Sequence, residues 1–480
     1  MLKKLFSDTI VYAFIPQLPK LVSFFILPIL TKDLTDFDYG ISGIIAAYIG
    51  GLAALKTLGL EDIFINYYYK HPKLYKKIWA HLFGFLSFYM IFFIIIIAVI
   101  LFFTLPIPVY KRLLIIVLNT ASLLFFSVTN MFGGRYLQLK QKPVPVATIS
   151  AVSGITVVFL NLLTISYFKL GYLGWFISSF IAALIQFVYY SHIVFFKIKL
   201  SPVFKFRYKY IKKYLKISTP LIPNKYGHFL LNSSDRIVMD ILKFSVKKLG
   251  LYNFGYNLGN YFQIIVSSVG LAIGPFYLQL LKINSKDSFL NAKKITFVVQ
   301  ASVLIMTTLA SLWMKQVFDI LVSNETLRTS YDIAIIIVMT QNYAPFRFYF
   351  TNLVVYNEKT SFLWKITFIG GIINVVLNFI FLKIFGIRVA AVTTFLSLFY
   401  ITVAGFYFPQ YKKIKKTKMY PLLLFFITLV ILLLVYLFRD IAVVYKIILS
   451  VIIIVFSFIV FIKLKKSKFF NSLQKITNSR

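Results

Sequence analysis

The chain is a series of long apolar stretches that are separated by short polar connections. A helix needs about 20 apolar residues to cross the hydrocarbon core of a bilayer, and fourteen stretches approach that length. The predicted spans are 8–30, 39–60, 78–104, 113–134, 144–166, 172–196, 217–240, 250–281, 295–314, 333–356, 361–382, 387–409, 419–438 and 443–462. No connection is long enough to fold as a soluble domain. The pattern therefore predicts an all-α, polytopic membrane protein with these 14 transmembrane helices.

The composition agrees with this fold class and excludes several functions. Hydrophobic residues make up 60% of the 480 residues, whereas soluble domains contain about one half. The net charge of +38 could suggest nucleic acid, but the basic residues lie in short clusters between apolar stretches, so we expect no nucleic-acid partner. The chain has no cysteine, and its four histidines lack HExxH spacing. We therefore expect no disulfide, no metal site and no cofactor.

The distribution of basic residues predicts the orientation in the membrane. Of the 52 Lys and Arg residues, 34 fall on one set of alternate connections, 13 fall on the other set, and five lie inside spans. Because basic residues concentrate on the cytoplasmic side, both termini are predicted to be cytoplasmic, in the cytoplasmic (inner) membrane. Segments 197–216 and 411–418 should be cytoplasmic, and 319–330 external. The N-terminal apolar stretch has no small-residue cleavage site, so we expect it to be retained as the first span.

Short similarities recur in the same order in two parts of the chain. They pair GITVVFLN from Gly154 with GIINVVLN from Gly371, PQLPK from Pro16 with PLIPNK from Pro220, Lys142 with Lys359, and Tyr39-Gly40-Ile41 with Leu249-Gly250-Leu251. Six spans separate the two parts, so both insert in the same orientation, which predicts two parallel six-helix lobes. The predicted domains are an N-terminal lobe at 1–196, a cytoplasmic basic linker at 197–216, a C-terminal lobe at 217–410, and two additional helices with a basic tail at 411–480.

The stretch Thr219–Asp240 is apolar enough to span a membrane but carries Lys225, Asp235, Arg236 and two prolines. A charge at the membrane centre costs roughly 2.5 to 3.5 kcal/mol on insertion scales, so such residues usually face a protein interior or a wet cavity. Prolines weaken a helix, and discontinuous helices often border transporter binding sites. The stretch is therefore predicted to form one wall of a polar cavity.

The cations inside spans outnumber the carboxylates, which favours an anionic ligand such as a phosphate. Lys20 lies about 18 Å along the first span at 1.5 Å per residue, and Arg347 follows Pro345 near the centre of the tenth span. Structural pairing is the alternative for both. Lys56 is close enough to the end of its span to reach the membrane surface. The candidate substrate-binding residues are Lys20, Lys56, Lys225, Arg236 and Arg347.

Asp235 and several amides allow more than one interpretation. Asp235 either neutralises a buried cation or serves as a proton or sodium site for coupling. Amides inside spans either contact sugar hydroxyls or form hydrogen bonds between helices. They include Asn161, Asn378, Gln263, Gln300 and Gln341.

Catalytic and nucleotide-binding motifs are missing from the sequence. There is no GxxxxGK[ST] motif, so the sequence does not predict a domain that drives transport by nucleotide hydrolysis. No large connection on the external side carries paired carboxylates or a Ser/His set, which disfavours a polymerase or a transferase. We therefore expect a membrane transporter with no catalytic residues.

Two segments resemble known proteins. FSDTIVYAFIPQLPKLVSFFILPILTKDLTDFDYGISGII, from Phe6, and LLNSSDRIVMDILKFSVKKLGLYNFGYNLG, from Leu230, are similar to the signatures of polysaccharide-export flippases of the O-antigen and capsule type. That family belongs to a superfamily with the lipid II flippases and the multidrug and toxin extruders. The resemblance covers most of the chain and is strongest in spans 1, 2, 7 and 8.

The resemblance implies a two-lobed bundle around a central cavity that moves undecaprenyl-diphosphate-linked oligosaccharide across the membrane by alternating access. Lys20, Lys56 and Arg236 are similar in placement to cavity cations of the lipid II flippases, although the family often has arginine at the first two positions. We expect Lys20, Arg347 and Lys225 to hold the diphosphate while the prenyl tail stays in lipid. The implied partners are membrane lipids and the glycan polymerase and glycosyltransferases of the same pathway.

Other functions remain as alternatives. A cation-coupled multidrug or toxin extruder would place acidic residues in its cavity, and Asp235 is one such residue. A membrane glycan polymerase or transferase is disfavoured by the missing catalytic connection. A scaffold in envelope assembly is a further alternative.

Overall fold

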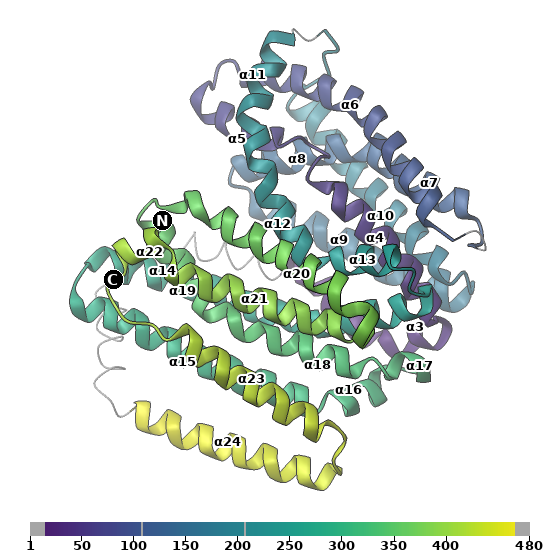
Figure 1. Cartoon of the computed structure of the whole chain (residues 1–480). Coiled ribbons are helices and arrows are strands. Elements are labelled where there is room, and N and C mark those ends of the chain that lie inside the picture. The colour runs from purple at the N-terminus through teal and green to yellow at the C-terminus, as the bar shows by residue number, and fades with distance from the viewer. Residues whose placement is uncertain (1–14, 107–108, 206–207, 466–480) are drawn as a thin grey trace. The chain divides into compact units, whose positions relative to one another are not determined.

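The computed structural model describes residues 15–106, 109–205 and 208–465, in which every regular element is helical (Figure 1). The predicted all-α fold is confirmed. The start of the first predicted span, two residues of the basic linker and most of the basic tail lie outside the described residues. The chain forms two compact units. Unit 1 consists of Met1–Phe254, Leu321–Leu327 and Val375–Ile387, and unit 2 of Gly255–Ile320, Arg328–Asn374 and Arg388–Arg480.

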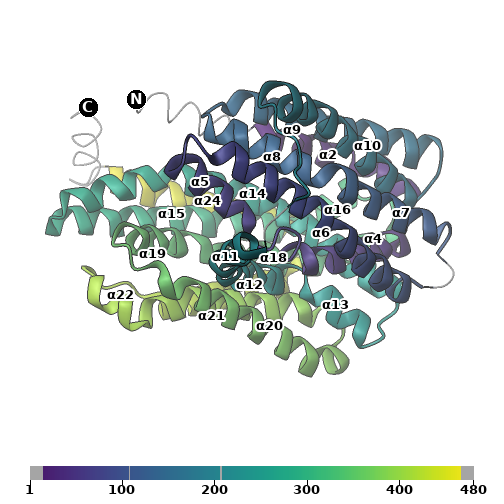
Figure 2. The same ribbon diagram turned by 90° about the horizontal axis from the view of Figure 1, so that it is seen from above.

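Unit 1 contains the helices of the first half of the chain. They are η1 (Ile15–Gln17), α2 (Leu18–Phe25), α3 (Leu27–Asp33), α4 (Asp36–Ala53), α5 (Leu60–Lys70), α6 (Tyr75–Thr104), α7 (Arg112–Ala121), η2 (Ser122–Phe126), α8 (Ser127–Leu139), α9 (Pro143–Asn161), η3 (Leu162–Tyr167), α10 (Tyr172–Ser191), η4 (His192–Lys197), α11 (Tyr208–Ser218), η5 (Thr219–Leu221), α12 (Ile222–Asn232), α13 (Ser234–Ile241) and the start of α14 (Val246–Ile283). Helices α9 and α10 lie side by side, and α11 lies against α5 (Figures 1 and 2).

An aromatic core fixes the packing of α5, α6 and α8. Phe64, Trp79 and Phe132 are fully buried, and the Phe64 and Phe132 rings lie 4.5 Å apart between centroids. Buried aromatic side chains remove large apolar areas and favour edge or tilted contacts, so they hold these helices in one arrangement.

The beginning of α4 is fixed by a capping box. The backbone nitrogen of Thr35 donates to Asp38 at 2.7 Å, and the Thr35 side chain accepts from the Asp38 backbone. The same Asp38 carboxylate accepts from the backbone nitrogen of Tyr172 at 2.8 Å. One buried side chain therefore ties the start of α4 to the start of α10.

Unit 2 contains the rest of α14 and most of the second half of the chain. The further helices are α15 (Lys286–Leu312), α16 (Met314–Leu321), α17 (Glu325–Arg328), α18 (Tyr331–Thr340), η6 (Gln341–Tyr343), α19 (Ala344–Tyr356), η7 (Thr360–Phe362), α20 (Leu363–Phe385), α21 (Val389–Tyr407), α22 (Pro409–Ile414), α23 (Pro421–Leu437), η8 (Phe438–Asp440) and α24 (Val443–Lys465). The end of α16, most of α17 and the second half of α20 belong to unit 1. Hydrogen bonds inside the unit include Asn342 to the Thr307 hydroxyl at 2.8 Å, which joins η6 to α15.

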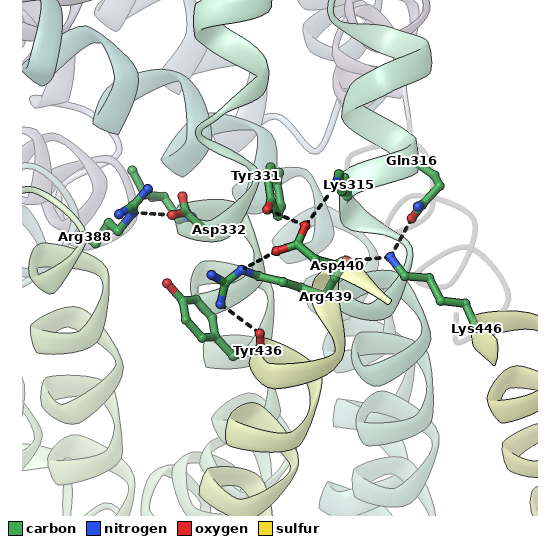
Figure 3. A network of polar contacts seen from close by, with 10 residues as sticks. Lys315, Gln316, Tyr331, Asp332, Arg388, Tyr436, Arg439, Asp440 and Lys446 are labelled. Carbon is green, nitrogen blue, oxygen red and sulfur yellow. Dashed lines mark hydrogen bonds and ion pairs between the residues drawn. The ribbon is translucent and has the colours of Figure 1, made fainter. Parts of the chain in front are cut away.

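A polar network holds the turn between α23 and α24 at one end of unit 2 (Figure 3). The Asp440 carboxylate accepts from the Lys315 ammonium at 2.8 Å and from the Tyr331 hydroxyl at 2.9 Å, and it forms an ion pair with Arg439 Nε at 3.3 Å. The hydrogen bond to Asp440 raises the pKa of Lys315. Lys446, at the start of α24, donates to the Gln316 side chain at 2.9 Å. The last two helices are therefore fastened to α16 and α18 by their connecting turn.

The hydropathy pattern located most helices within a few residues. The span predicted at 78–104 is α6, and the span predicted at 419–438 is α23. Among the described residues, nine helical runs are long and apolar enough to cross a membrane, and Val443–Ile459 is a shorter apolar helix. The predicted number of 14 spans remains a prediction, because several predicted spans are divided into shorter helices.

Two predicted spans differ from the structure in an informative way. The continuous helix predicted at 39–60 is wrong, because α4 ends at Ala53 and residues 54–59 form a turn that places Gly59 in the left-handed region at φ 72°. The seventh predicted span is discontinuous, as expected: the 3-10 turn η5 contains Pro220, and a second break at Ser233 separates α12 from α13. Non-helical backbone at residues 54–59 and at Ser233 interrupts stretches that remain apolar in sequence.

Candidate functional site

Helix α13 carries two neighbouring charged residues, Asp235 and Arg236, and both are buried. Asp235 Oδ2 accepts a hydrogen bond from the Tyr252 hydroxyl, and its Oδ1 accepts from Asn378 Nδ2 at 2.7 Å. These donors lie on α14 and on the second half of α20. The carboxylate thus joins three helices of unit 1, and it is stabilised by hydrogen bonds from uncharged groups.

The Arg236 guanidinium is held by groups of α12 and α14. Its Nε donates to Asn253 Oδ1 at 3.1 Å, its Nη1 donates to the Asn232 carbonyl at 2.7 Å, and it lies 5.3 Å from the Tyr252 ring centroid. Asn253 in turn donates to the Tyr39 carbonyl at 3.0 Å. Arg236 therefore belongs to a chain of hydrogen bonds that connects α13 to α14 and α14 to α4.

A second charged cluster surrounds Glu61, in the first turn of α5. Its carboxylate forms ion pairs with Lys225 of α12 and, at 3.1 Å, with Arg135 of α8. Lys56, in the turn before α5, is partly buried and interacts electrostatically with the same carboxylate. The cluster combines three cations with one carboxylate, so it keeps a positive excess in partly buried surroundings.

Lys20 and Arg347 differ from the other candidates because neither side chain forms a hydrogen bond or an ion pair in the described part of the chain. Lys20 lies exposed on α2, and Arg347 lies partly buried on α19. Among the residues that the structure describes, neither has a hydrogen-bond or ion-pair partner. An arginine on an apolar helix with no carboxylate partner is available to bind an anion.

The structure brings the sequence candidates into two groups and leaves two residues apart. Lys225 pairs with Glu61, whose charge also influences Lys56, and Asp235 and Arg236 both contact the Tyr252 side chain. Lys20 belongs to unit 1 and Arg347 to unit 2.

Glu61, Tyr252 and Asn253 are important contacts that the sequence interpretation did not single out. The signal for Glu61 is the scarcity of acidic residues, since the whole chain has only 14 Asp and Glu. Each carboxylate among 52 basic residues is therefore expected to have a specific partner. Asn378 was identified as an interhelical hydrogen-bond donor or a sugar ligand, and it acts as a donor to Asp235.

No described group of three or more His, Cys, Asp or Glu side chains could hold a metal ion. The side-chain chemistry of the candidate site consists of Lys and Arg cations, the Asp235 and Glu61 carboxylates, and Asn and Tyr hydrogen-bonding groups. Such a set can bind and position an anion, and it offers hydrogen bonds to hydroxyl groups.

Solved structures show the same fold. An inward-facing multidrug resistance MATE family transporter of the MOP superfamily matches with a TM-score of 0.63 and 14% identity, over 86% of this chain and 100% of that one. The lipid II flippase MurJ in an inward closed conformation matches with a TM-score of 0.60 and 13% identity, over 91% of this chain and 97% of that one. A MATE transporter in the straight conformation matches with a TM-score of 0.54 and 13% identity, over 85% and 95%.

The family is shown by a sequence comparison. No curated protein sequence matches the chain. A family model described as "Polysaccharide biosynthesis protein" matches residues 5–280, which is more than half of the chain. With its apolar helices and its transporter fold, the chain is a multi-pass membrane protein that belongs to the polysaccharide biosynthesis protein family.

Proposed function

We propose that the protein is a flippase that moves undecaprenyl-diphosphate-linked oligosaccharide across the cytoplasmic membrane by alternating access. The family supports a substrate of polysaccharide biosynthesis, and the lipid II flippase fold supports a lipid-linked one. The observation that carries the proposal is the unpartnered Arg347 guanidinium on an apolar helix, among the described residues. A diphosphate in low-dielectric surroundings would supply the missing negative charge.

The cations take different roles in this proposal. Lys20 and Arg347 bind the diphosphate directly, because neither side chain has to leave a partner in the described part of the chain. Lys225 binds it after leaving Glu61, and Lys56 and Arg135 keep that carboxylate neutralised meanwhile. Arg236 positions α13 through its contacts with Asn253. The sugars occupy a wet cavity, and the prenyl chain stays in lipid.

Orientation and partners follow from the same proposal. Both termini, the basic linker 197–216 and segment 411–418 lie in the cytoplasm, because lipid-linked glycans are assembled there and exported outward. Glycosyltransferases of the pathway supply the substrate on that side, and a glycan polymerase accepts it on the other. Since the chain contains no cysteine, single introduced cysteines report the side of each segment without background labelling.

Charge substitutions with two readouts test the function. Lys20→Arg and Arg347→Lys should retain partial glycan export, neutral variants should lose most of it, and Lys20→Glu and Arg347→Glu should abolish it at normal membrane abundance. Lipid-linked oligosaccharide should then accumulate on the inner leaflet. Lys32→Glu and Lys365→Glu, both at exposed positions, are the matched controls and should export normally. Normal export by both glutamate variants at the candidate positions would refute the proposal.

A cation-coupled multidrug extruder is the second candidate, because a MATE family transporter shares the fold and Asp235 is a buried carboxylate. In that case Asp235→Asn should abolish export of a cationic dye by intact cells. In a flippase in which Asp235 only joins helices, the same variant should lower thermal stability, and glycan export should fall only as far as membrane abundance falls.

A further inference from the structure

Unit 1 contains a pocket of about 740 Å³ at the end where α6 and α13 finish. One wall is formed by the last turn of α6, including Phe102 and Phe103. The opposite wall is the connection from α13 to α14, with Asp240, Lys243 and Ser245. Arg112, the first residue of α7, completes the lining. None of these residues is among the proposed diphosphate ligands.

The pocket has two available cations. The Arg112 guanidinium lies 4.4 Å from the Phe102 ring centroid, and its Nε is buried without a hydrogen-bond partner in the described part of the chain. Lys243 is exposed, and no described group pairs with its ammonium. A buried, unsatisfied donor is costly, so the vicinity of Arg112 favours a ligand that accepts hydrogen bonds.

The carboxylate in the pocket does not cancel this charge. Asp240 accepts a hydrogen bond from the Tyr48 hydroxyl of α4 at 2.7 Å. Within the described residues, no ion pair connects Asp240 to Arg112 or to Lys243. The lining therefore has two cations for one carboxylate, and the carboxylate already has a donor. A small anion with several oxygens fits this arrangement, because a guanidinium binds phosphate oxygens in pairs.

The apolar wall indicates that the anion belongs to a lipid. Phe103 is 80% exposed, and the outward face of α6 continues with exposed Val99 and Ile95. Helix α6 is a 30-residue apolar helix, so its end lies where lipid phosphates meet the hydrocarbon core. A hydrocarbon chain along this face would cover the exposed apolar side chains while its phosphate reached Arg112.

We propose that this pocket binds the phosphate of an anionic membrane lipid, with Arg112 and Lys243 as ligands and the lipid chain along α6. The site is separate from substrate translocation and does not depend on the proposed function. Two lipid sources share the required chemistry, an anionic phospholipid and a polyprenyl diphosphate. Free phosphate shares the charge but lacks the chain.

Native mass spectrometry of the purified full chain would measure lipid affinity. Phosphatidylglycerol should bind more tightly than phosphatidylcholine, and Arg112→Gln with Lys243→Gln should weaken phosphatidylglycerol binding by about tenfold or more, since each removes a charged hydrogen bond. Lys243→Arg should retain most of the affinity. Lys111→Gln is the matched control, because Lys111 adjoins Arg112 but its ammonium lies 5.0 Å from the Tyr110 ring centroid and does not line the pocket.

A second readout keeps the test decisive if the Arg112 variant folds poorly. Lys243 is exposed, so Lys243→Gln alone should preserve the fold. Ser245→Cys introduces a single thiol in the pocket of a chain without cysteine. Its alkylation in nanodiscs should slow when phosphatidylglycerol is added to phosphatidylcholine, and Lys243→Gln should reduce that protection.

Comparing the protection given by different ligands identifies the occupant of the pocket. Protection by polyprenyl diphosphate greater than that by phosphatidylglycerol would support the site and identify the prenyl lipid as its occupant. Equal protection by inorganic pyrophosphate and by lipids would overturn the lipid assignment, because the apolar wall would then contribute nothing. Phosphatidylglycerol affinity that is unchanged in Lys243→Gln and in the double variant would overturn the site itself.

Discussion

The amide nitrogen of Gly40 lies 2.7 Å from the position that a Cβ atom would occupy at Gly250. The reciprocal neighbours of Gly40 are backbone and side-chain atoms of Val246, at the start of α14. Helices α4 and α14 therefore cross in direct backbone contact within unit 1. Small residues permit such crossings between apolar helices, where packing and not water exclusion drives association.

Alanine at either crossing glycine should force the two helices apart. We expect Gly40→Ala and Gly250→Ala each to destabilise the protein by about 1–3 kcal/mol, because backbone atoms cannot make room for the added methyl group. Thermal unfolding in detergent would measure the loss. Gly50→Ala is the control on the same helix, since its Cβ would meet only Phe229 at 3.8 Å. Equal melting temperatures for Gly40→Ala and Gly50→Ala would contradict the crossing.

The Glu61 cluster should show charge compensation. Glu61→Gln leaves Lys225 and Arg135 without their carboxylate, and Lys225→Gln leaves Glu61 with one ion pair fewer. We expect the Glu61 variant to lose more membrane abundance, with a cost of about 1–3 kcal/mol for each unpaired, partly buried charge. The double variant should recover part of the abundance.

Glycan export by the double variant distinguishes two roles for Lys225. If Lys225 binds the diphosphate, the double variant should still export poorly at its recovered abundance. Restored export together with restored abundance would limit Lys225 to pairing with Glu61. Quantitative blotting of membranes beside a surface glycan assay gives both values.

Gln300 is a buried residue on α15 whose two side-chain polar atoms lack partners in the described part of the chain. A buried amide without hydrogen bonds costs about 1–3 kcal/mol relative to an apolar group of similar shape. Gln300→Met should therefore raise the melting temperature. Gln263→Met, on an exposed face of α14, should leave it unchanged. A lower melting temperature for the Gln300 variant would indicate a hydrogen-bonded ligand or water at that site.

Removing the charge of Asp440 should loosen the turn between α23 and α24. Exposed ion pairs contribute less than about 1 kcal/mol each, so Asp440→Asn should change the global melting temperature little. Hydrogen exchange in residues 438–446 should nevertheless become faster, because Lys315, Tyr331 and Arg439 lose a shared acceptor. Asp319→Asn, an exposed carboxylate on α16, is the control and should leave that exchange unchanged.

The positions of the helices could be predicted from the sequence because membrane spans follow hydropathy. A stretch such as that of α6 has no alternative to crossing the bilayer as a helix, since unpaired backbone groups are not tolerated there. The family was also identified from local signatures near the starts of spans 1 and 7. Both kinds of information lie within continuous stretches of the chain.

The contacts of the candidate residues could not be predicted in the same way. Lys225 and Glu61 are separated by 164 positions, and Asp235 and Asn378 by 143. Periodicity identifies the face of a helix but not its neighbour, so pairing partners remain unknown until helices are placed. The repeat did associate Gly40 with Gly250, and these residues meet.

Four helices, α14, α16, α17 and α20, contain residues of both units, and the long ones are α14 and α20. Helix α14 passes from unit 1 to unit 2 after Phe254, and α20 returns from unit 2 to unit 1 after Asn374, each without a helical break. A loop would let the units reorient freely, whereas a continuous helix resists bending along its whole hydrogen-bonded length. Helical backbone hydrogen bonding therefore continues at the two places where α14 and α20 pass from one unit to the other.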